Sequence, residues 1–324
     1  MKYLALPALL SLGFSLSHPV AAQAAGFFEF SSTPTEVQLA YESFYRGNYE
    51  KMCDQIKTAL MAYPNDLAIK QNLMELYDRA LAVRGKVGIN AGLKLPSSIK
   101  YMTVGIRKRL VLGRDVVKYQ VTSAVDFMKG DELEQLRIVA FPNQVVLDKK
   151  GKVGEFDEMA LGADQMSAYG STIAGQEPAQ EGLYLVDVKM KSGENTSGYF
   201  FVSKMTASDS PEVLNPLPDA EFSAGRPQFT WRDFVSKEYQ SYEKRRLGIR
   251  VSTYETGDDL WAYNGEVIQN TKMEYGVPTE EYPQGVPPLS AGKYTFRVVY
   301  REKHVSGDLS LARESVTIVP FSVK

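Results

Sequence analysis

Apolar residues alternate with polar ones along most of this chain, from about Ile99 to the C-terminus. In one such stretch Val104 and Ile106 occupy even positions, whereas Arg107 and Arg109 occupy odd positions. A period of two is that of a β-strand with one buried face. Stretches rich in glycine, aspartate and asparagine separate the alternating segments. Short strands at regular spacing with turn signals between them predict a β-sandwich.

The alternating pattern is interrupted at residues 206–219, which are rich in proline, serine and acidic residues. This composition is typical of an interdomain linker. We therefore predict two β-rich domains, residues 95–205 and residues 220–324. Within the first domain, the polar and glycine-rich residues 162–180 are predicted to form a long loop.

The second β-rich domain has a characteristic turn that leads into an apolar strand. Leu289, Gly292 and Tyr294 are spaced as in the tyrosine corner, and Trp231 lies on an apolar strand face near the start of the domain. In these features residues 227–323 resemble fibronectin type III and related immunoglobulin-like sandwiches. The resemblance implies that the Tyr294 hydroxyl bonds back to the connecting backbone and that Trp231 lies in the core.

The match departs from the family pattern in a long insertion, residues 256–288, where strands remain unassigned. The first β-rich domain has a weaker form of the same turn around Gly182 and Tyr184. Two tandem immunoglobulin-like β-sandwiches are therefore expected.

Before the strands, apolar residues recur every three or four positions between Thr33 and Gly85, which predicts three amphipathic helices. Thr33 is a candidate N-cap with Glu36 completing a capping box, and Asn48 is a candidate cap of the second helix. Helices of this kind must pack together to bury their apolar faces.

This helical segment, residues 25–94, resembles a short tetratricopeptide repeat. The resemblance rests on the small, aromatic and proline positions Leu39, Ala40, Gly47, Tyr49, Ala59 and Pro64, and it departs from the repeat at Ser43 and Met52. The second unit lacks its second helix. The resemblance allows a peptide-docking groove or a small helical cap on the next domain, and we favour the cap because three helices form little concave surface. The overall class is multidomain and mainly β.

Residues 1–24 have Lys2 followed by an apolar run and then small residues, the pattern of a secretory signal peptide. An uncleaved membrane anchor is the alternative, but the run is short and contains Pro7. We expect an exported protein without a transmembrane segment after cleavage, in the periplasm, outside the cell or on the surface of a bacterium. Cys53 is the only cysteine, so it is either packed in the helical segment or paired with another chain.

Histidine and cysteine are scarce, and the carboxylate pairs Asp258-Asp259 and Glu280-Glu281 are interpreted as exposed loop acids. His18 lies in the signal peptide and His304 is the only other histidine, so a Ser–His–Asp or Cys–His system or a zinc site lacks partners. The formal net charge of −2 gives no global basic field for nucleic acid. The basic clusters at 107–109 and 244–246 are interpreted as solvated strand faces. We predict a protein that is not an enzyme and has no cofactor, no metal site and no nucleic-acid partner.

Aromatic residues are numerous in and around the insertion of the last domain, and they are the candidate binding residues: Tyr239, Tyr242, Trp261, Tyr263, Tyr275 and Tyr282. Aromatic faces on loops can stack on sugar rings or anchor a protein partner. The first hypothesis is a non-catalytic envelope protein that binds or scaffolds other envelope proteins. The alternative is a glycan- or peptidoglycan-binding protein that uses these aromatic residues.

Overall fold

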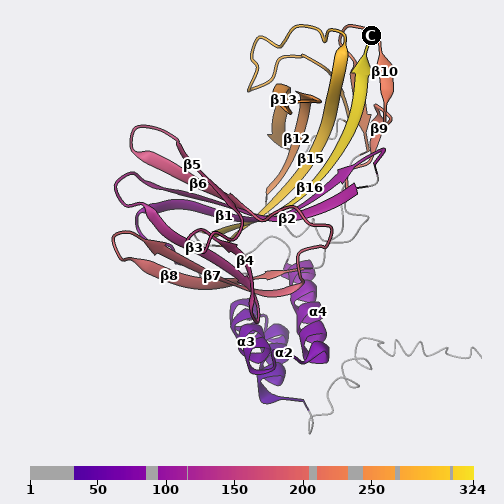
Figure 1. Ribbon diagram of the computed structural model, residues 1–324. Coiled ribbons are helices and arrows are strands. Elements are labelled where there is room, and N and C mark those ends of the chain that lie inside the picture. Colours follow the sequence, from indigo (N-terminus) through magenta and orange to yellow (C-terminus); the bar gives the residue numbers. More distant parts are fainter. Residues whose placement is uncertain are drawn as a thin grey trace, which may run out of the picture.

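A computed structural model describes residues 33–84, 94–114, 116–203, 210–232, 244–266, 271–306 and 309–324 of the 324-residue chain. The predicted signal peptide, the candidate residues Tyr239 and Tyr242, and the side chain of His304 lie outside the described part. The fold is mainly β, with 51% of the described residues in strands and three helices ahead of the sheets (Figure 1).

The three predicted helices are present as α2 (Thr35–Tyr45), α3 (Tyr49–Ala62) and α4 (Leu67–Arg84). The Asn48 side chain accepts a hydrogen bond from the Lys51 N–H and caps α3, as predicted. The predicted cap at Thr33 is wrong, because Pro34 is the N-cap of α2 and no side chain caps this end. A proline at this position lacks the N–H that would otherwise need a partner, and its φ of −56° suits the entry into the helix.

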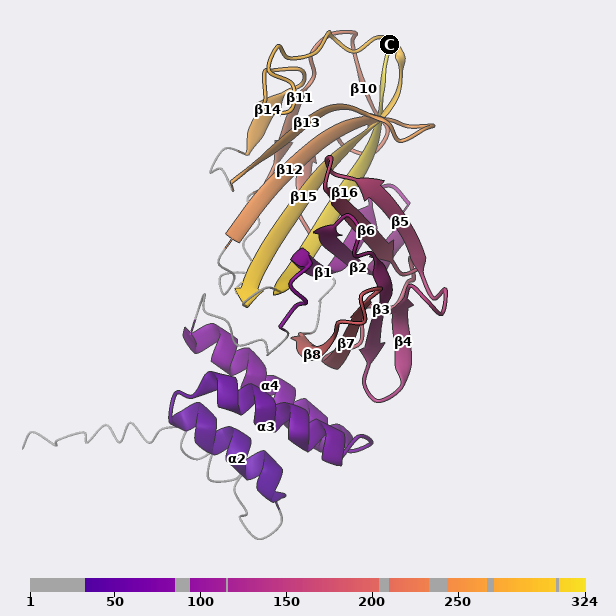
Figure 2. The same cartoon turned by 90° about the vertical axis from the view of Figure 1, so that its left-hand side faces the viewer.

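The helices pack as a cap on the outer face of one β-sheet. Their buried residues form a cluster with Leu183, Tyr199 and Phe201 of the strands below, and the rings of Tyr77 and Phe201 lie 4.9 Å apart. Cys53 is buried in this cluster. The prediction of a helical cap seated against the first sandwich, with Cys53 packed inside, is confirmed (Figure 2).

The described strands form three sheets. The first sandwich contains β1 (Ile99–Val111), β2 (Val116–Met128), β3 (Leu133–Ala140), β4 (Gln144–Asp148), β5 (Glu155–Ala160), β6 (Gln165–Ser171), β7 (Gly182–Met190) and β8 (Asn195–Val202). The C-terminal part contains β9 (Val213–Asn215), β10 (Ala220–Phe222), β11 (Gln228–Trp231), β12 (Lys244–Thr253), β13 (Asp259–Glu266), β14 (Lys272–Glu274), β15 (Gly292–Ser306) and β16 (Leu309–Val323).

Two predicted irregular segments contain strands. The predicted loop 162–180 includes β6, which pairs with β2 and β5. The predicted linker includes β9, which pairs with β11. Both segments are rich in polar and turn-forming residues, but their backbone groups pair with neighbouring strands. This pairing outweighs the low intrinsic β propensity of the residues.

One sheet runs through both sandwiches. Its order is β13-β12-β15-β16-β1-β2-β6-β5, with β10 also paired to β16. The connection is a ten-residue parallel ladder in which Met102 to Val111 of β1 pair with Leu309 to Ile318 of β16. The strand nearest the C-terminus is therefore hydrogen-bonded along its length to the first strand of the first sandwich, and Figure 1 shows the sheet curving from one lobe into the other.

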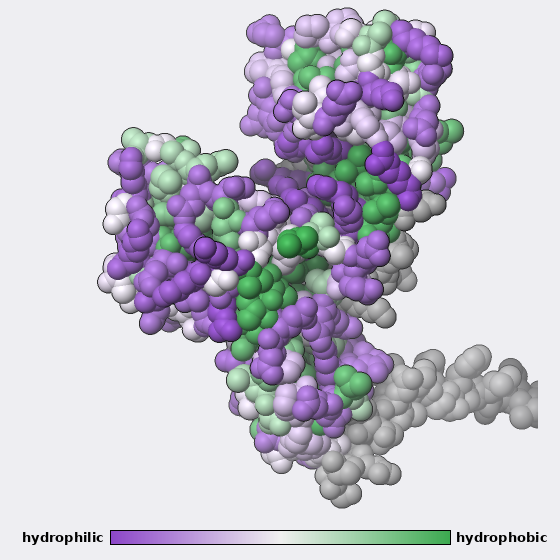
Figure 3. All heavy atoms as spheres, viewed as in Figure 1, coloured by the Kyte–Doolittle hydropathy of each residue, from purple (hydrophilic) through white to green (hydrophobic). Residues whose placement is uncertain are grey.

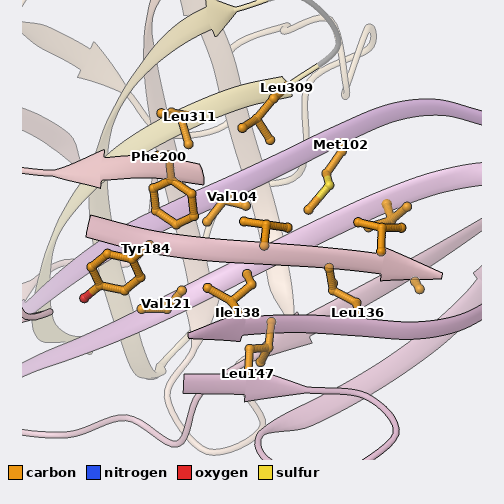
Figure 4. Close-up of a cluster of buried hydrophobic side chains, with 14 of the residues drawn as sticks. Met102, Val104, Val121, Leu136, Ile138, Leu147, Tyr184, Phe200, Leu309 and Leu311 are labelled. Carbon is orange, nitrogen blue, oxygen red and sulfur yellow. The ribbon is translucent and has the colours of Figure 1, made fainter. Parts of the chain in front are cut away.

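The shared strand β16 also joins the two cores. Leu309 and Leu311 at its start pack in the core of the first sandwich, which a four-stranded sheet (β4-β3-β7-β8) covers from the other side (Figure 4). Val319 and Phe321 near its end pack in the C-terminal core, against a three-stranded sheet (β14-β11-β9). These side chains all occupy odd positions, so both cores lie against the same face of the continuous sheet.

Both predicted tyrosine corners are formed. The Tyr294 hydroxyl donates to the Ser290 carbonyl at 2.9 Å, and the Tyr184 hydroxyl donates to the Gln180 carbonyl at 2.8 Å. Trp231 is buried in the C-terminal core, as the resemblance implied. In the described part of the chain, no helix combines the length and the apolar character required to cross a membrane.

Candidate functional site

The described aromatic candidates do not form a surface. Trp261 has no exposed area and Tyr275 is 3% exposed, and their rings meet edge to face at 5.8 Å inside the C-terminal core. The Trp261 indole N–H donates to the Val277 carbonyl at 2.9 Å. Tyr263 and Tyr282 are partly buried against the same core, and burial raises the pKa of the Tyr263 and Tyr275 hydroxyls. The prediction that Trp261 and Tyr275 are exposed binding residues is therefore wrong, and for the partly buried Tyr263 and Tyr282 it stays a prediction.

A different site lies on the opposite face of the continuous sheet. This arginine hollow is a cavity of about 570 Å³. Six arginines line it: Arg107, Arg109, Arg246, Arg250, Arg297 and Arg301. Figure 3 shows hydrophilic residues gathered in the recess between the two sandwich lobes, where this face of the sheet lies.

Strand register explains why side chains from distant parts of the sequence meet here. The first row across the sheet contains one residue from each of four adjacent strands. In order, these are Arg246 of β12, Arg301 of β15, Glu314 of β16 and Arg107 of β1. All four side chains of this row point away from the cores, because the core residues of these strands occupy the alternate positions.

The next two rows of the sheet complete the hollow. Gly248, Val299, Val316 and Arg109 form the second row, and this row gives the hollow a partly apolar floor. Arg250 and Arg297 belong to the third row. Gly248 leaves the floor open where a side chain would crowd Asn264 and Val299, since a Cβ there would lie 3.0 Å from the Asn264 Oδ1 atom.

Three of the six arginines form ion pairs with acidic residues. Glu314 binds two of them: its Oε1 atom lies 2.6 Å from Arg107 Nε, and its Oε2 atom lies 2.7 Å from Arg301 Nη2. Although burial opposes it, the charges of Arg107 and Arg301 hold the pKa of Glu314 below its usual value. Arg250 forms an ion pair with Asp259.

The other three arginines have no acidic partner among the described residues. Arg109, Arg246 and Arg297 form no ion pair there, and the Nε atoms of Arg109 and Arg297 are buried without a hydrogen-bond partner. Burial lowers the pKa of Arg109, and the nearby positive charges of Arg107 and Arg297 lower it further. Arg109 and Arg297 lie on the two strands that flank β16, so their charges approach each other over that strand.

One rim of the hollow is acidic. Glu280 and Glu281 line it from the loop that follows β14, and both are exposed. The Asn264 side-chain amide of β13 donates to Glu281 and ties this loop to the sheet edge. The site therefore has a cationic end over β1, β16 and β15 and a carboxylate- and amide-bearing end over β13.

The interpretation of the basic clusters as solvated strand faces is only partly right. Arg246 is exposed, but Lys108 is fully buried, and Arg107 and Arg109 line the hollow. The available signal was the spacing of arginines by an even number of residues within three strands: 107 and 109, 246 and 250, 297 and 301. Such spacing puts both arginines of a strand on one face, but it does not reveal which strands are neighbours.

Comparisons with solved structures give only weak similarity, to fibronectin(III)-like and immunoglobulin-like chains. No protein-family model and no curated protein matches this chain. The fibronectin(III)-like modules of Clostridium thermocellum CbhA are similar to it at 10% identity and a TM-score of 0.23, covering 72% of this chain and 94% of that one. The ectodomain (Ig1–Ig3) of mouse nectin-like molecule 4 is similar at 10% identity and a TM-score of 0.23, over 71% and 66% of the two chains. Three N-terminal domains of the bacteriophage RB49 Hoc protein are similar at 11% identity and a TM-score of 0.24, covering 72% of this chain and 69% of that one.

Proposed function

We propose that this protein is an exported, non-catalytic binding protein of a bacterial cell envelope, an interaction or scaffold module that holds an acidic group of its partner in the arginine hollow. The observation that carries the proposal is the convergence of Arg109 and Arg297, whose buried Nε atoms have no partner among the described residues. Both residues line the hollow, and their guanidinium N–H groups can donate charge-assisted hydrogen bonds to an oxyanion bound there.

The chemistry of the lining suits binding. Guanidinium groups remain protonated at physiological pH and present donors in a planar fork that matches oxyanions. The valines of the floor, Val299 and Val316, offer apolar contact. A cavity with an apolar floor and a few convergent polar groups is the usual form of a binding site.

The architecture suits a scaffold. The β1–β16 ladder joins the sandwiches through one sheet, and the helical cap is packed on the outer face of β7 and β8. A partner held in the hollow would therefore have a fixed relation to the helices. Immunoglobulin-like sandwiches host many interaction modules, which supports the proposal by analogy. The signal-peptide pattern of residues 1–24 supports export.

Glycan binding is the second candidate, and one observation favours it. The exposed carboxylates of Glu280 and Glu281, beside Asn264, can accept hydrogen bonds from sugar hydroxyls. This version of the hypothesis uses the rim of the hollow, because Trp261 and Tyr275 are occupied in the core.

Site-specific photocrosslinking in the source cells tests the proposal. A photoreactive residue at Arg246, which is exposed beside the hollow, should yield a defined crosslinked envelope partner. A photoreactive residue in place of Arg46, which is exposed at the end of α2, is the control and should yield no crosslinked partner. The crosslink should disappear when Arg109→Gln and Arg297→Gln are introduced together. Absence of a product at position 246, or a product that survives both substitutions, would contradict the proposal.

A further inference from the structure

The cationic end of the hollow demands more than one negative charge. Arg109 and Arg297 lie on strands separated by β16 and in neighbouring rows, so their backbones are roughly 12 Å apart. Their side chains nevertheless line the same hollow, where the charge of Arg297 also lowers the pKa of Arg109. A group held between them must accept hydrogen bonds from two forks that approach from opposite sides.

A phosphate monoester meets that demand better than a carboxylate does. It carries roughly two negative charges at neutral pH and three strong acceptor oxygens. A carboxylate brings one negative charge and two oxygens, so between two arginines it leaves one positive charge uncompensated. Arg107 and Arg301 already share such a carboxylate, that of Glu314, and the hollow retains uncompensated positive charge beside it.

The acidic end selects what the phosphate is attached to. Glu280 and Glu281 repel a second anionic group, but they accept hydrogen bonds from hydroxyls, and Asn264 adds an amide. Between the two ends, Gly248 and Val299 form the floor of the hollow, and the apolar C–H face of a sugar ring can pack against them. The cavity of about 570 Å³ has the size of an ordinary small-ligand site.

We infer that the arginine hollow binds a phosphorylated sugar, with the phosphate monoester between Arg109 and Arg297 and the sugar hydroxyls toward Glu281. This inference rests on the proposed function and names the acidic group that the protein holds. An acidic protein segment would satisfy the arginines but would place further carboxylates or peptide groups beside Glu280 and Glu281. A phosphorylated sugar is complementary at both ends of the hollow.

Calorimetric titration of the folded protein tests the inference with matched probes. Glucose 6-phosphate and glucuronate share a sugar ring and differ in the anionic group at the same carbon. Glucose 6-phosphate should bind at least about ten-fold more tightly than glucuronate and more tightly than inorganic phosphate, because charge-assisted hydrogen bonds and sugar contacts add. Glucose should show no measurable binding.

Variants assign the binding to the hollow. Arg109→Gln and Arg297→Gln should each weaken glucose 6-phosphate binding roughly ten-fold or more, since each removes a charged donor to the phosphate. Glu281→Gln should reduce the preference for glucose 6-phosphate over inorganic phosphate. Arg46→Gln should change nothing. Thermal unfolding of each variant separates lost binding from lost folding.

The remaining outcomes are decisive for the inference. Equal affinity for glucose 6-phosphate and glucuronate would overturn it, as would tight binding of a hexaglutamate peptide without binding of glucose 6-phosphate, although the latter would leave the proposed acidic-partner function standing. Binding of none of the anionic probes would overturn both. Phosphatidylcholine vesicles with and without a phosphorylated diglucosamine lipid distinguish the source of the group. Selective binding of the phosphorylated vesicles would support a lipid-borne sugar phosphate, and binding of free glucose 6-phosphate alone would support a soluble one.

Discussion

Arg107 and Glu314 are more than 200 positions apart in the sequence, yet they face each other across the parallel pair of β1 and β16 with an Nε–Oε1 distance of 2.6 Å. Glu314 also binds Arg301 of β15, so one carboxylate links three adjacent strands at the junction of the two sandwiches. The same row of the sheet forms one side of the arginine hollow. The residue pair that joins the sandwiches therefore also organises the candidate site.

Replacing Glu314 should destabilise the fold. Glu314→Gln leaves the guanidinium groups of Arg107 and Arg301 without their acidic partner in a mostly buried site. Loss of one member of a buried ion pair costs about 3 kcal/mol or more, and urea denaturation measures it. Glu221→Gln, which removes an exposed pairing with Lys324, should cost under about 1 kcal/mol. Equal effects of the two substitutions would contradict the assigned role of Glu314.

The contribution of Glu314 should depend on pH. Its pKa in the folded protein lies below the usual value of 4.5, so the unfolded chain takes up the proton first as the pH falls. The stability that the ionised carboxylate contributes is therefore complete above this value and is lost as the pH falls through the lower, folded-state pKa. Urea denaturation measures the difference in free energy of unfolding between the wild type and Glu314→Gln. This difference should be constant at neutral pH and should shrink below about pH 4.5. A difference in free energy of unfolding that grows as the pH falls would contradict this pH dependence.

The two sandwiches should unfold together, because β16 contributes to both cores. Leu311→Ala removes a C-terminal side chain from the core of the first sandwich and should cost about 2–3 kcal/mol. Thermal unfolding followed by calorimetry should remain a single transition shifted to lower temperature. Exposed Leu217 offers the control, since Leu217→Ala should leave the transition nearly unchanged. Two separate transitions in the wild type would show that the shared strand does not couple the cores.

Trp261 should matter for folding. Its side chain is fully buried and its indole N–H is bonded to Val277, so Trp261→Ala should lower the free energy of unfolding by about 3–5 kcal/mol. Circular dichroism melting measures the loss. If the Trp261→Ala variant retained wild-type stability, the ring could not lie in the C-terminal core.

Sequence periodicity predicts the mainly β class and the three helices, and the resemblance to immunoglobulin-like sandwiches implies the tyrosine corners. All of these features depend on residues close together in the chain. Tyr294 and Ser290, for example, are four residues apart. The pairing of β1 with β16 could not be predicted in this way, because parallel strands this distant leave no local signal. The arginine hollow depends on that pairing. The aromatic candidates were misleading for a related reason: Trp261 and Tyr275 lie in an insertion that reads as loop but supplies strands and core packing.

The account is tested most directly at the Nε–H groups of Arg109 and Arg297, which are buried and without a partner among the described residues. Proton–nitrogen NMR spectra with arginine side-chain assignments report each of these groups separately. On addition of glucose 6-phosphate, the signals of Arg109 and Arg297 should shift, whereas the signal of Arg46 should stay in place. Unchanged signals at Arg109 and Arg297, or equal shifts at all arginines, would contradict the claim that the hollow is a built site for an anionic ligand.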